Sequence, residues 1–169
     1  MKKNNKGFTL VELIVVIGII AILAGMVGIG VGMVGKKPAQ ECSRKLVSVL
    51  QKAQRTAAGK SYNRVTVKRD TEGRIVVIQN YKGAEISESE MEMTVVGQKS
   101  VDVVYTLDGG SSYISIDETP LSFSFDRASA SIGYANNTNS YCTEIHVTRG
   151  GGTSFDIELL PLTGRISEK

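Results

Sequence analysis

An uncharged, strongly apolar stretch near the amino terminus constrains this chain more than any other feature. No side chain is charged from residue 13 to residue 34, and Lys2, Lys3 and Lys6 come just before the stretch. About 20 consecutive apolar residues are enough for an α-helix to cross the hydrocarbon core of a bilayer. The stretch therefore predicts a membrane-spanning helix that follows a short basic segment.

One acidic residue, Glu12, lies at the beginning of this predicted helix. A carboxylate inside a membrane-spanning segment costs about 2.5–3.5 kcal/mol on insertion scales, and such residues are by default functional and have a specific partner. In a medium of low dielectric constant, pairing with a cation recovers much of that cost. Glu12 is therefore the first candidate functional residue of the chain.

The residues around Glu12 resemble the class III signal of type IV pilins and pseudopilins. The pattern of that family is a short basic leader, a glycine, Phe-Thr-Leu, a hydrophobic residue, a glutamate and an apolar helix. Here the leader ends at Gly7, and Phe8-Thr9-Leu10-Val11-Glu12 and the apolar run follow it. The resemblance is close in the amino-terminal region and loose in the rest of the chain.

The resemblance implies that a prepilin peptidase cleaves between Gly7 and Phe8, and that the new amine of Phe8 is N-methylated. It also implies that the Glu12 carboxylate pairs with the Phe8 amine of a neighbouring subunit, which sets the register of assembly. The implied partners are other pilin or pseudopilin subunits, the peptidase, an assembly platform protein and the membrane; no cofactor is implied. The protein would be a single-pass membrane protein with a cytoplasmic amino terminus and an exported head, and later part of a periplasmic or cell-surface fibre.

Two other interpretations of the amino-terminal segment stay open. An uncut segment would be an anchor that tethers a β-domain binding DNA or a surface ligand. Cleavage by a conventional signal peptidase near Gly32 would release a secreted domain that begins at Met33, although no Ala-x-Ala site is present there. The amino-terminal residue of the mature protein distinguishes the three interpretations.

An amphipathic helix is expected after the apolar run, in residues 36–60. Apolar residues recur with helical spacing along one face, and basic residues occupy the other. Pro38 indicates a kink or the start of a new helix, and Gly59 indicates the end of the helix. The apolar stripe should pack against a β-sheet. It consists of Cys42, Leu46, Val49, Leu50, Ala53 and Ala57.

The hydrophobic period changes to two after Gly59, which predicts β-strands. Two pairs of strands, flanking residues 70–73 and 149–152, should form hairpins because both connections contain glycine. Further strands are expected in residues 91–96, 101–107, 113–116 and 121–125 and around Ile166.

The expected fold class is α+β: a long amino-terminal helix packed on an antiparallel sheet or a small β-sandwich, as in pilins. The expected segments are a leader (1–7), a transmembrane and assembly helix (8–35), an amphipathic helix (36–60) and a β-rich head (61–169).

Composition gives little support for a nucleic-acid partner or for an enzyme. The net charge is +3 at pH 7, and the three leader lysines account for it. Arg165 and Lys169 form only a thin basic patch, without interleaved aromatic residues on which bases could stack. The sequence contains no phosphate-binding loop and no nucleophile elbow, so no catalytic residue is predicted.

The cysteines and the single histidine are the remaining candidates for chemistry. Cys42 and Cys142 could form a disulfide in an exported domain, but the sequence does not establish that they meet. Strict alternation along the predicted strand places Cys142, Glu144 and His146 on one outer face. These three could in principle ligate a metal, but a solvated outer face is the expected role, and no metal is predicted.

Within the family, one helix followed by strands resembles the minor pseudopilins of the GspH/FimT type. Leu162-Thr163-Gly164-Arg165-Ile166 resembles their closing strand, but Ser167 stands where DNA-binding members have a second arginine. A major pilin or a pseudopilin of another class is the alternative. The sequence is compatible with a type IV pilus, a type II secretion pseudopilus or a competence fibre.

Overall fold

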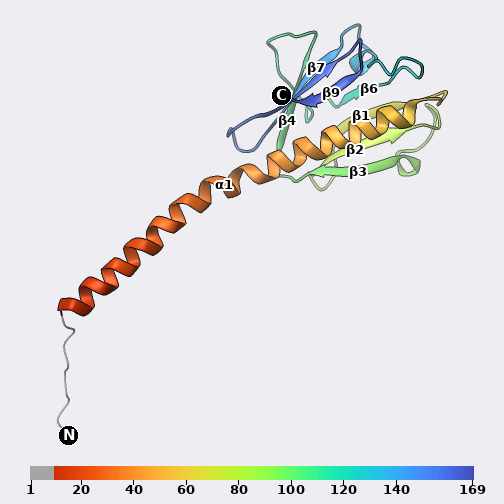
Figure 1. Ribbon diagram of the computed structural model, residues 1–169. Helices are drawn as coiled ribbons and strands as arrows, with labels where there is room; N and C mark the ends of the chain where they lie inside the picture. Colours follow the sequence, from red (N-terminus) through yellow and green to blue (C-terminus); the bar gives the residue numbers. More distant parts are fainter. Residues whose placement is uncertain (1–9) are drawn as a thin grey trace. The chain divides into compact units, whose positions relative to one another are not determined.

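The computed structural model describes residues 10–169, except for the side chains of residues 23–36. The predicted cleavage-site residues, Gly7 and Phe8, lie outside the described part. The chain divides into two compact units, Met1–Gly35 and Lys36–Lys169. Helix α1 (Leu10–Ala57) supplies residues to both units (Figure 1), and each unit is described by itself.

Residues 37–57 of α1 contribute one face to the core of the second unit. The predicted apolar stripe is confirmed, since Cys42, Leu46 and Leu50 are buried and the remaining members are buried or half-buried. Pro38 lies inside α1, where proline removes one helical hydrogen bond. The helix ends as expected near Gly59, which adopts a left-handed φ of +77° after the last turn.

The described residues after α1 form nine strands in two antiparallel sheets. The first sheet has the order β3-β2-β1-β6, and the second has the order β5-β4-β7-β8-β9. The strands of the first sheet are β1 (Arg64–Arg69), β2 (Ile75–Asn80), β3 (Glu92–Gly97) and β6 (Leu121–Phe123). Those of the second are β4 (Asp102–Leu107), β5 (Ile114–Ser115), β7 (Cys142–Thr148), β8 (Phe155–Leu160) and β9 (Arg165–Glu168). Two short 3-10 helices, η1 (Glu88–Glu90) and η2 (Ala135–Asn137), lie in the connections.

Both predicted hairpins are present. The expected fold class, α+β with antiparallel sheets, is confirmed. β1 pairs with β2 across a turn in which Asp70 accepts the N–H groups of Glu72, Gly73 and Arg74. β7 pairs with β8 across residues 149–152. The strands β3 and β4 follow each other closely in the chain but belong to different sheets, so residues 98–101 cross between the two.

One hydrophobic core joins α1 to both sheets. Its members include Leu46 and Leu50 of the helix, Val67 of the first sheet, and Tyr105 and Ile157 of the second. Burial of such side chains contributes about 1.5–3 kcal/mol for each large one.

Polar side chains of the helix also contact the chain near its carboxyl end. Gln51 Nε2 donates to the carbonyl of Ile166 (2.9 Å). Gln54 Nε2 donates to the carbonyls of Ala130 (2.8 Å) and Gly164 (2.6 Å). The bonds to Gly164 and Ile166 fix the last strand against α1, and the bond to Ala130 holds the loop before η2.

Candidate functional site

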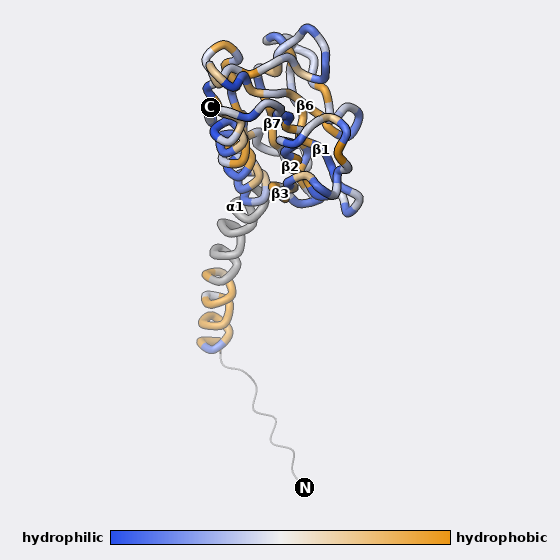
Figure 2. The backbone as a smooth tube through the Cα atoms, turned by 90° about the vertical axis from the view of Figure 1, so that its right-hand side faces the viewer, coloured by the Kyte–Doolittle hydropathy of each residue, from blue (hydrophilic) through white to orange (hydrophobic). Residues whose placement is uncertain are grey.

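The first part of α1, residues 10–22, exposes apolar side chains around its whole circumference. Figure 2 shows this part of the helix as an almost uniformly hydrophobic segment. Exposure of its large side chains ranges from 48% at Val16 to 76% at Leu10. A helix that is apolar on all sides is normally buried in a protein or in a membrane. This segment therefore requires cover from lipid or from other chains.

Glu12 is the one charged residue among residues 10–22, and its side chain is exposed in the first turn of α1. A carboxylate in the first turn is stabilised by the partial positive charge at a helix amino terminus, typically by about 0.3–1 kcal/mol. The predicted partner group, the amine of Phe8, lies outside the described residues.

The predicted membrane span, residues 13–34, is only partly covered by the described side chains. Within the described part of the chain, no helix has both the length and the apolar character needed to cross a membrane.

In the second unit, Cys42 and Cys142 are free thiols, and both are buried. Burial raises the pKa of the Cys42 thiol to about 12, although Lys45 and Arg69 act in the opposite direction. Burial also raises the pKa of the Cys142 thiol. Because the thiolate is the reactive form, both cysteines are unreactive at neutral pH. A disulfide between them stays a prediction.

The expected common face of Cys142, Glu144 and His146 is wrong. Cys142 is buried in the core, whereas Glu144 and His146 are half-buried. The cause is a β-bulge at Thr143: Thr106 of β4 pairs with Glu144, and the next residue of β4 pairs with Cys142. The extra residue reverses the direction in which Cys142 points. No cluster of three metal-binding side chains occurs in the part of the chain that the structure describes.

His146 lies between two carboxylates instead. Its Nδ1 is 2.7 Å from Asp156 Oδ1, and its Nε2 is 3.5 Å from Glu144 Oε2. Burial acts to raise the pKa of Asp156, but hydrogen bonds from Ser154 and His146 outweigh it and the pKa is lowered. The pair was missed in the sequence, although the register of the β7–β8 hairpin places His146 directly opposite Asp156.

The structure places Arg165 on β9 and Lys169 just beyond it, with different surroundings. Arg165 is exposed. Lys169 Nζ donates to Glu144 Oε1 (2.8 Å), and this bond, with the nearby charges of Glu158 and Asp156, raises the pKa of Lys169. Its positive charge is therefore balanced locally, which gives no electrostatic support to a nucleic-acid contact.

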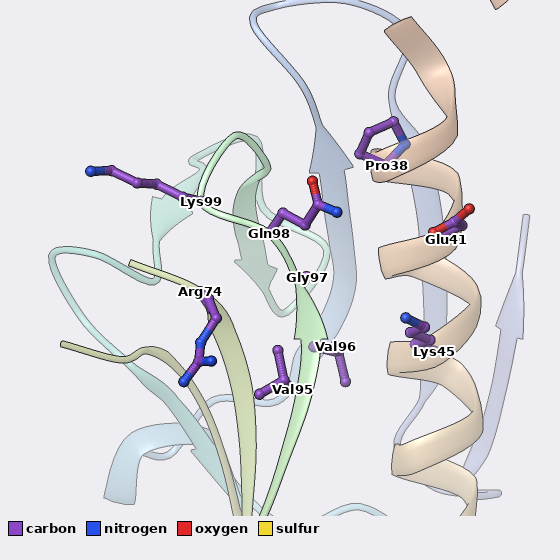
Figure 3. Close-up of a pocket in the computed structure, with 9 residues that line it drawn as sticks. All are labelled: Pro38, Glu41, Lys45, Arg74, Val95, Val96, Gly97, Gln98 and Lys99. Carbon is purple, nitrogen blue, oxygen red and sulfur yellow. The ribbon is translucent and has the colours of Figure 1, made fainter. Parts of the chain in front are cut away.

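A groove of about 160 Å³ lies between α1 and the end of β3. Figure 3 shows Pro38, Glu41 and Lys45 along the helix on one side of it, and Val96 pointing toward the helix on the other. Gln98 and Lys99 continue the second side, and Arg74 and Val95 also line the groove. Three of its four charged side chains are basic.

Comparison with known families identifies the amino-terminal segment. Residues 2–28 match the family described as prokaryotic N-terminal methylation motif. The chain carries the class III signal of type IV pilins. The matched range contains Gly7, Phe8 and Glu12, and it includes the exposed apolar residues of the first part of α1.

The class III signal implies a pilin-like precursor that prepilin peptidase processes, and association with other pilin subunits. It also suggests a precursor anchored in the inner membrane that assembles into a surface or periplasmic fibre. No curated protein matches the chain, and no solved structure does.

Proposed function

We propose that the chain is a structural subunit, a minor pseudopilin, of a type IV pilus or of a type II secretion or competence pseudopilus. Prepilin peptidase cleaves it between Gly7 and Phe8, and the amine of Phe8 is methylated. The observation that carries the proposal is the methylation motif in residues 2–28, joined to a helix whose apolar side chains are exposed on every side. Such a helix is stable only among lipids or packed against similar helices.

Cleavage changes the electrostatics of the segment. It removes the three leader lysines and creates one amine at Phe8. Glu12 is then left in an apolar environment where an unpaired carboxylate is costly, so it pairs with the Phe8 amine of a neighbouring subunit. A subunit is accepted only where its carboxylate meets a free amine, and this sets the register of the fibre.

The head provides lateral contacts or forms the tip of the fibre. The assignment to the GspH/FimT type is supported by the resemblance of residues 162–166 to the closing strand of that type; these residues form the turn before β9 and the start of β9. The platform protein, the peptidase and the assembly motor are separate proteins, and the chain itself contributes structure.

The proposal is tested by determining the amino-terminal residue of the membrane-extracted protein, by intact mass and peptide sequencing. An N-methylated Phe8 is the expected result. A start at Met1 would indicate the tethered β-domain, and a start at Met33 would indicate the secreted one. Either of these results would overturn the fibre assignment.

Substitution of Glu12 tests the pairing step. Glu12→Val should leave cleavage largely intact but prevent incorporation into wild-type fibres, because the Phe8 amine of the neighbour loses its partner. The measurement is the amount of the variant in sheared fibres, relative to the amount in membranes. Val16→Leu is the matched control, since it keeps an apolar exposed side chain in the same segment. Normal incorporation of Glu12→Val would show that the carboxylate does not set the register.

A further inference from the structure

Four strands form the outer edges of the two sheets: β3 and β6 in the first, and β5 and β9 in the second. An edge strand presents unpaired N–H and C=O groups that can pair with another chain. Natural proteins usually block such edges by shortening them, by capping them or by placing Lys or Pro on them.

Three of the four edges are short and capped. β6 has three residues, and the N–H of Ser122 donates to Asn136 Oδ1 (2.7 Å). β9 has four residues, and the carbonyl of Ile166 accepts the bond from Gln51. β5 has two residues, and the carbonyl of Ser115 accepts the N–H of Thr119 (3.0 Å).

The fourth edge, β3, differs in length, in capping and in composition, and its one irregularity is a bulge at Val96, near its end. It is six residues long and contains neither Lys nor Pro. In the described part of the chain, only the ladder with β2 bonds to its backbone. Its outer face is apolar, with Met93 54% exposed and Val95 44% exposed. This is the kind of edge to which an extended segment of another chain adds.

The charges at the two ends of β3 are opposite. Glu88, Glu90 and Glu92 lie at or just before its beginning, and Lys99 lies just after its end. Glu90 and Lys99 take part in none of the ion pairs of the described residues. In an antiparallel pair, the beginning of one strand lies beside the end of the other. Two copies of β3 would thus set acidic residues against basic ones at both ends, and apolar residues against each other in the middle.

We propose that β3 binds the β3 strand of a second copy of this chain, antiparallel and about a two-fold axis. The two four-stranded sheets then become one continuous sheet of eight strands. Such an interface is isologous, because each copy offers the same surface. Six residues span about 20 Å of strand, so the contact is a modest one that gains its selectivity from the charges at both ends. It does not depend on the function proposed above.

Cysteine cross-linking of the full chain in detergent tests the geometry. At the centre of a two-fold antiparallel pair, directly opposite residues have Cα atoms about 4.5–5.5 Å apart. The two-fold axis sets Met93 opposite Met93, Met93 opposite Val95, or Val95 opposite Val95. One combination, either Met93→Cys alone, a mixture of Met93→Cys and Val95→Cys, or Val95→Cys alone, should therefore give disulfide-linked dimers under mild oxidation, at least tenfold more than wild type. The native thiols are buried. Leu162→Cys, 84% exposed, is the control for random collision. Equal cross-linking by the control, or none at β3, would overturn the proposal.

Charge reversal tests the two-fold axis. Glu90→Lys and Lys99→Glu should each weaken dimerisation about fivefold or more in low salt, because each reversal occurs twice in the dimer. A mixture of the two variants should dimerise like wild type, since every new charge then meets its opposite. Sedimentation in detergent measures the dimer fraction. If the dimer fraction of the mixture stays as low as that of each variant alone, this pairing is ruled out.

Val95→Lys separates β3 pairing from association through the apolar part of α1. Lysine on an edge strand opposes strand addition. The side chain at this position is exposed, so the circular dichroism spectrum should not change. The variant should lose the dimer, and a dimer that survives this substitution would run through another surface and contradict the proposal.

Discussion

Gly164 occupies a position where only glycine fits. Its φ is +69°, and a Cβ added there would lie 2.1 Å from the carbonyl oxygen of Ala130 and 2.5 Å from Gln54 Nε2. Gly164→Ala should lower the free energy of unfolding by about 2–4 kcal/mol, because it adds left-handed strain and displaces the Gln54 hydrogen bonds. Denaturant unfolding followed by circular dichroism measures this.

Gly151→Ala is the matched control for Gly164→Ala. Gly151 has nearly the same φ, +71°, but no atom lies within 4 Å of an added Cβ. Gly151→Ala should lower the free energy of unfolding only by the strain of a left-handed alanine, about 1–2 kcal/mol. Equal costs at the two positions would show that the contact with Gln54 and Ala130 contributes nothing.

Gly97 and Cys42 form a second close contact, between β3 and α1. An added Cβ at Gly97 would lie 2.6 Å from Cys42 Sγ and 3.0 Å from Ile75 Cγ1. Gly97→Ala should lower the free energy of unfolding by about 1–3 kcal/mol, because the added methyl group overpacks this contact. In the Cys42→Ala background the cost should fall by at least about 0.5 kcal/mol, because the sulfur is gone. Additive effects in this double-mutant cycle would contradict the contact.

Among the elements, Arg69 at the end of β1 connects the two sheets. Its Nε donates to Asp117 Oδ1 (2.6 Å), beyond β5. Its Nη1 donates to the carbonyl of Gly73 (2.8 Å), and its Nη2 to that of Val101 (3.1 Å). Arg69→Met should lower the free energy of unfolding by about 2–3 kcal/mol, measured by denaturant unfolding, since two partly buried carbonyls lose their donor.

Arg69→Lys tests whether the planar guanidinium matters. An ammonium group cannot donate to Asp117 and to carbonyls on both sides at once, so lysine should recover less than half of the loss. Full recovery would indicate that charge alone is responsible. The side chain of Arg69 is mostly buried, with 19% of it exposed, so the effect should persist in high salt.

Elements with local signals were predictable from the sequence, and those that depend on distant partners were not. The stripe on α1 follows from helical spacing, and the hairpins at residues 70–73 and 149–152 follow from their turn residues. Neither the division into two sheets nor the bulge at Thr143 has a local signal, because strand partners are chosen by packing. The same holds for the candidate sites: the motif around Glu12 is readable because it is contiguous, whereas the open edge of β3 appears only when the other edges are seen to be capped.

For the molecule as a whole, the division into two units predicts that the second unit folds without the first. Among the described residues, the hydrophobic core draws on Ala39 to Ile166 and on no residue of 10–22. A chain of residues 36–169 should therefore unfold cooperatively, with a Tm within a few degrees of that of the full chain in detergent. Calorimetry measures both. A molten or aggregated truncated chain would show that the first unit is needed for folding.

The bonds between α1 and the end of the chain also affect the order in which the head forms. Gln51 and Ile166 are 115 residues apart, and Ser43 and Glu168, joined by a 3.0 Å hydrogen bond, are 125 apart. Contacts of such long range form late, because a large loop has to close before they contribute. Helix α1, which the ribosome makes before the strands, therefore gains these contacts only after β9 has formed. Loss of a few carboxyl-terminal residues would leave the polar groups of α1 without the strand that they hold.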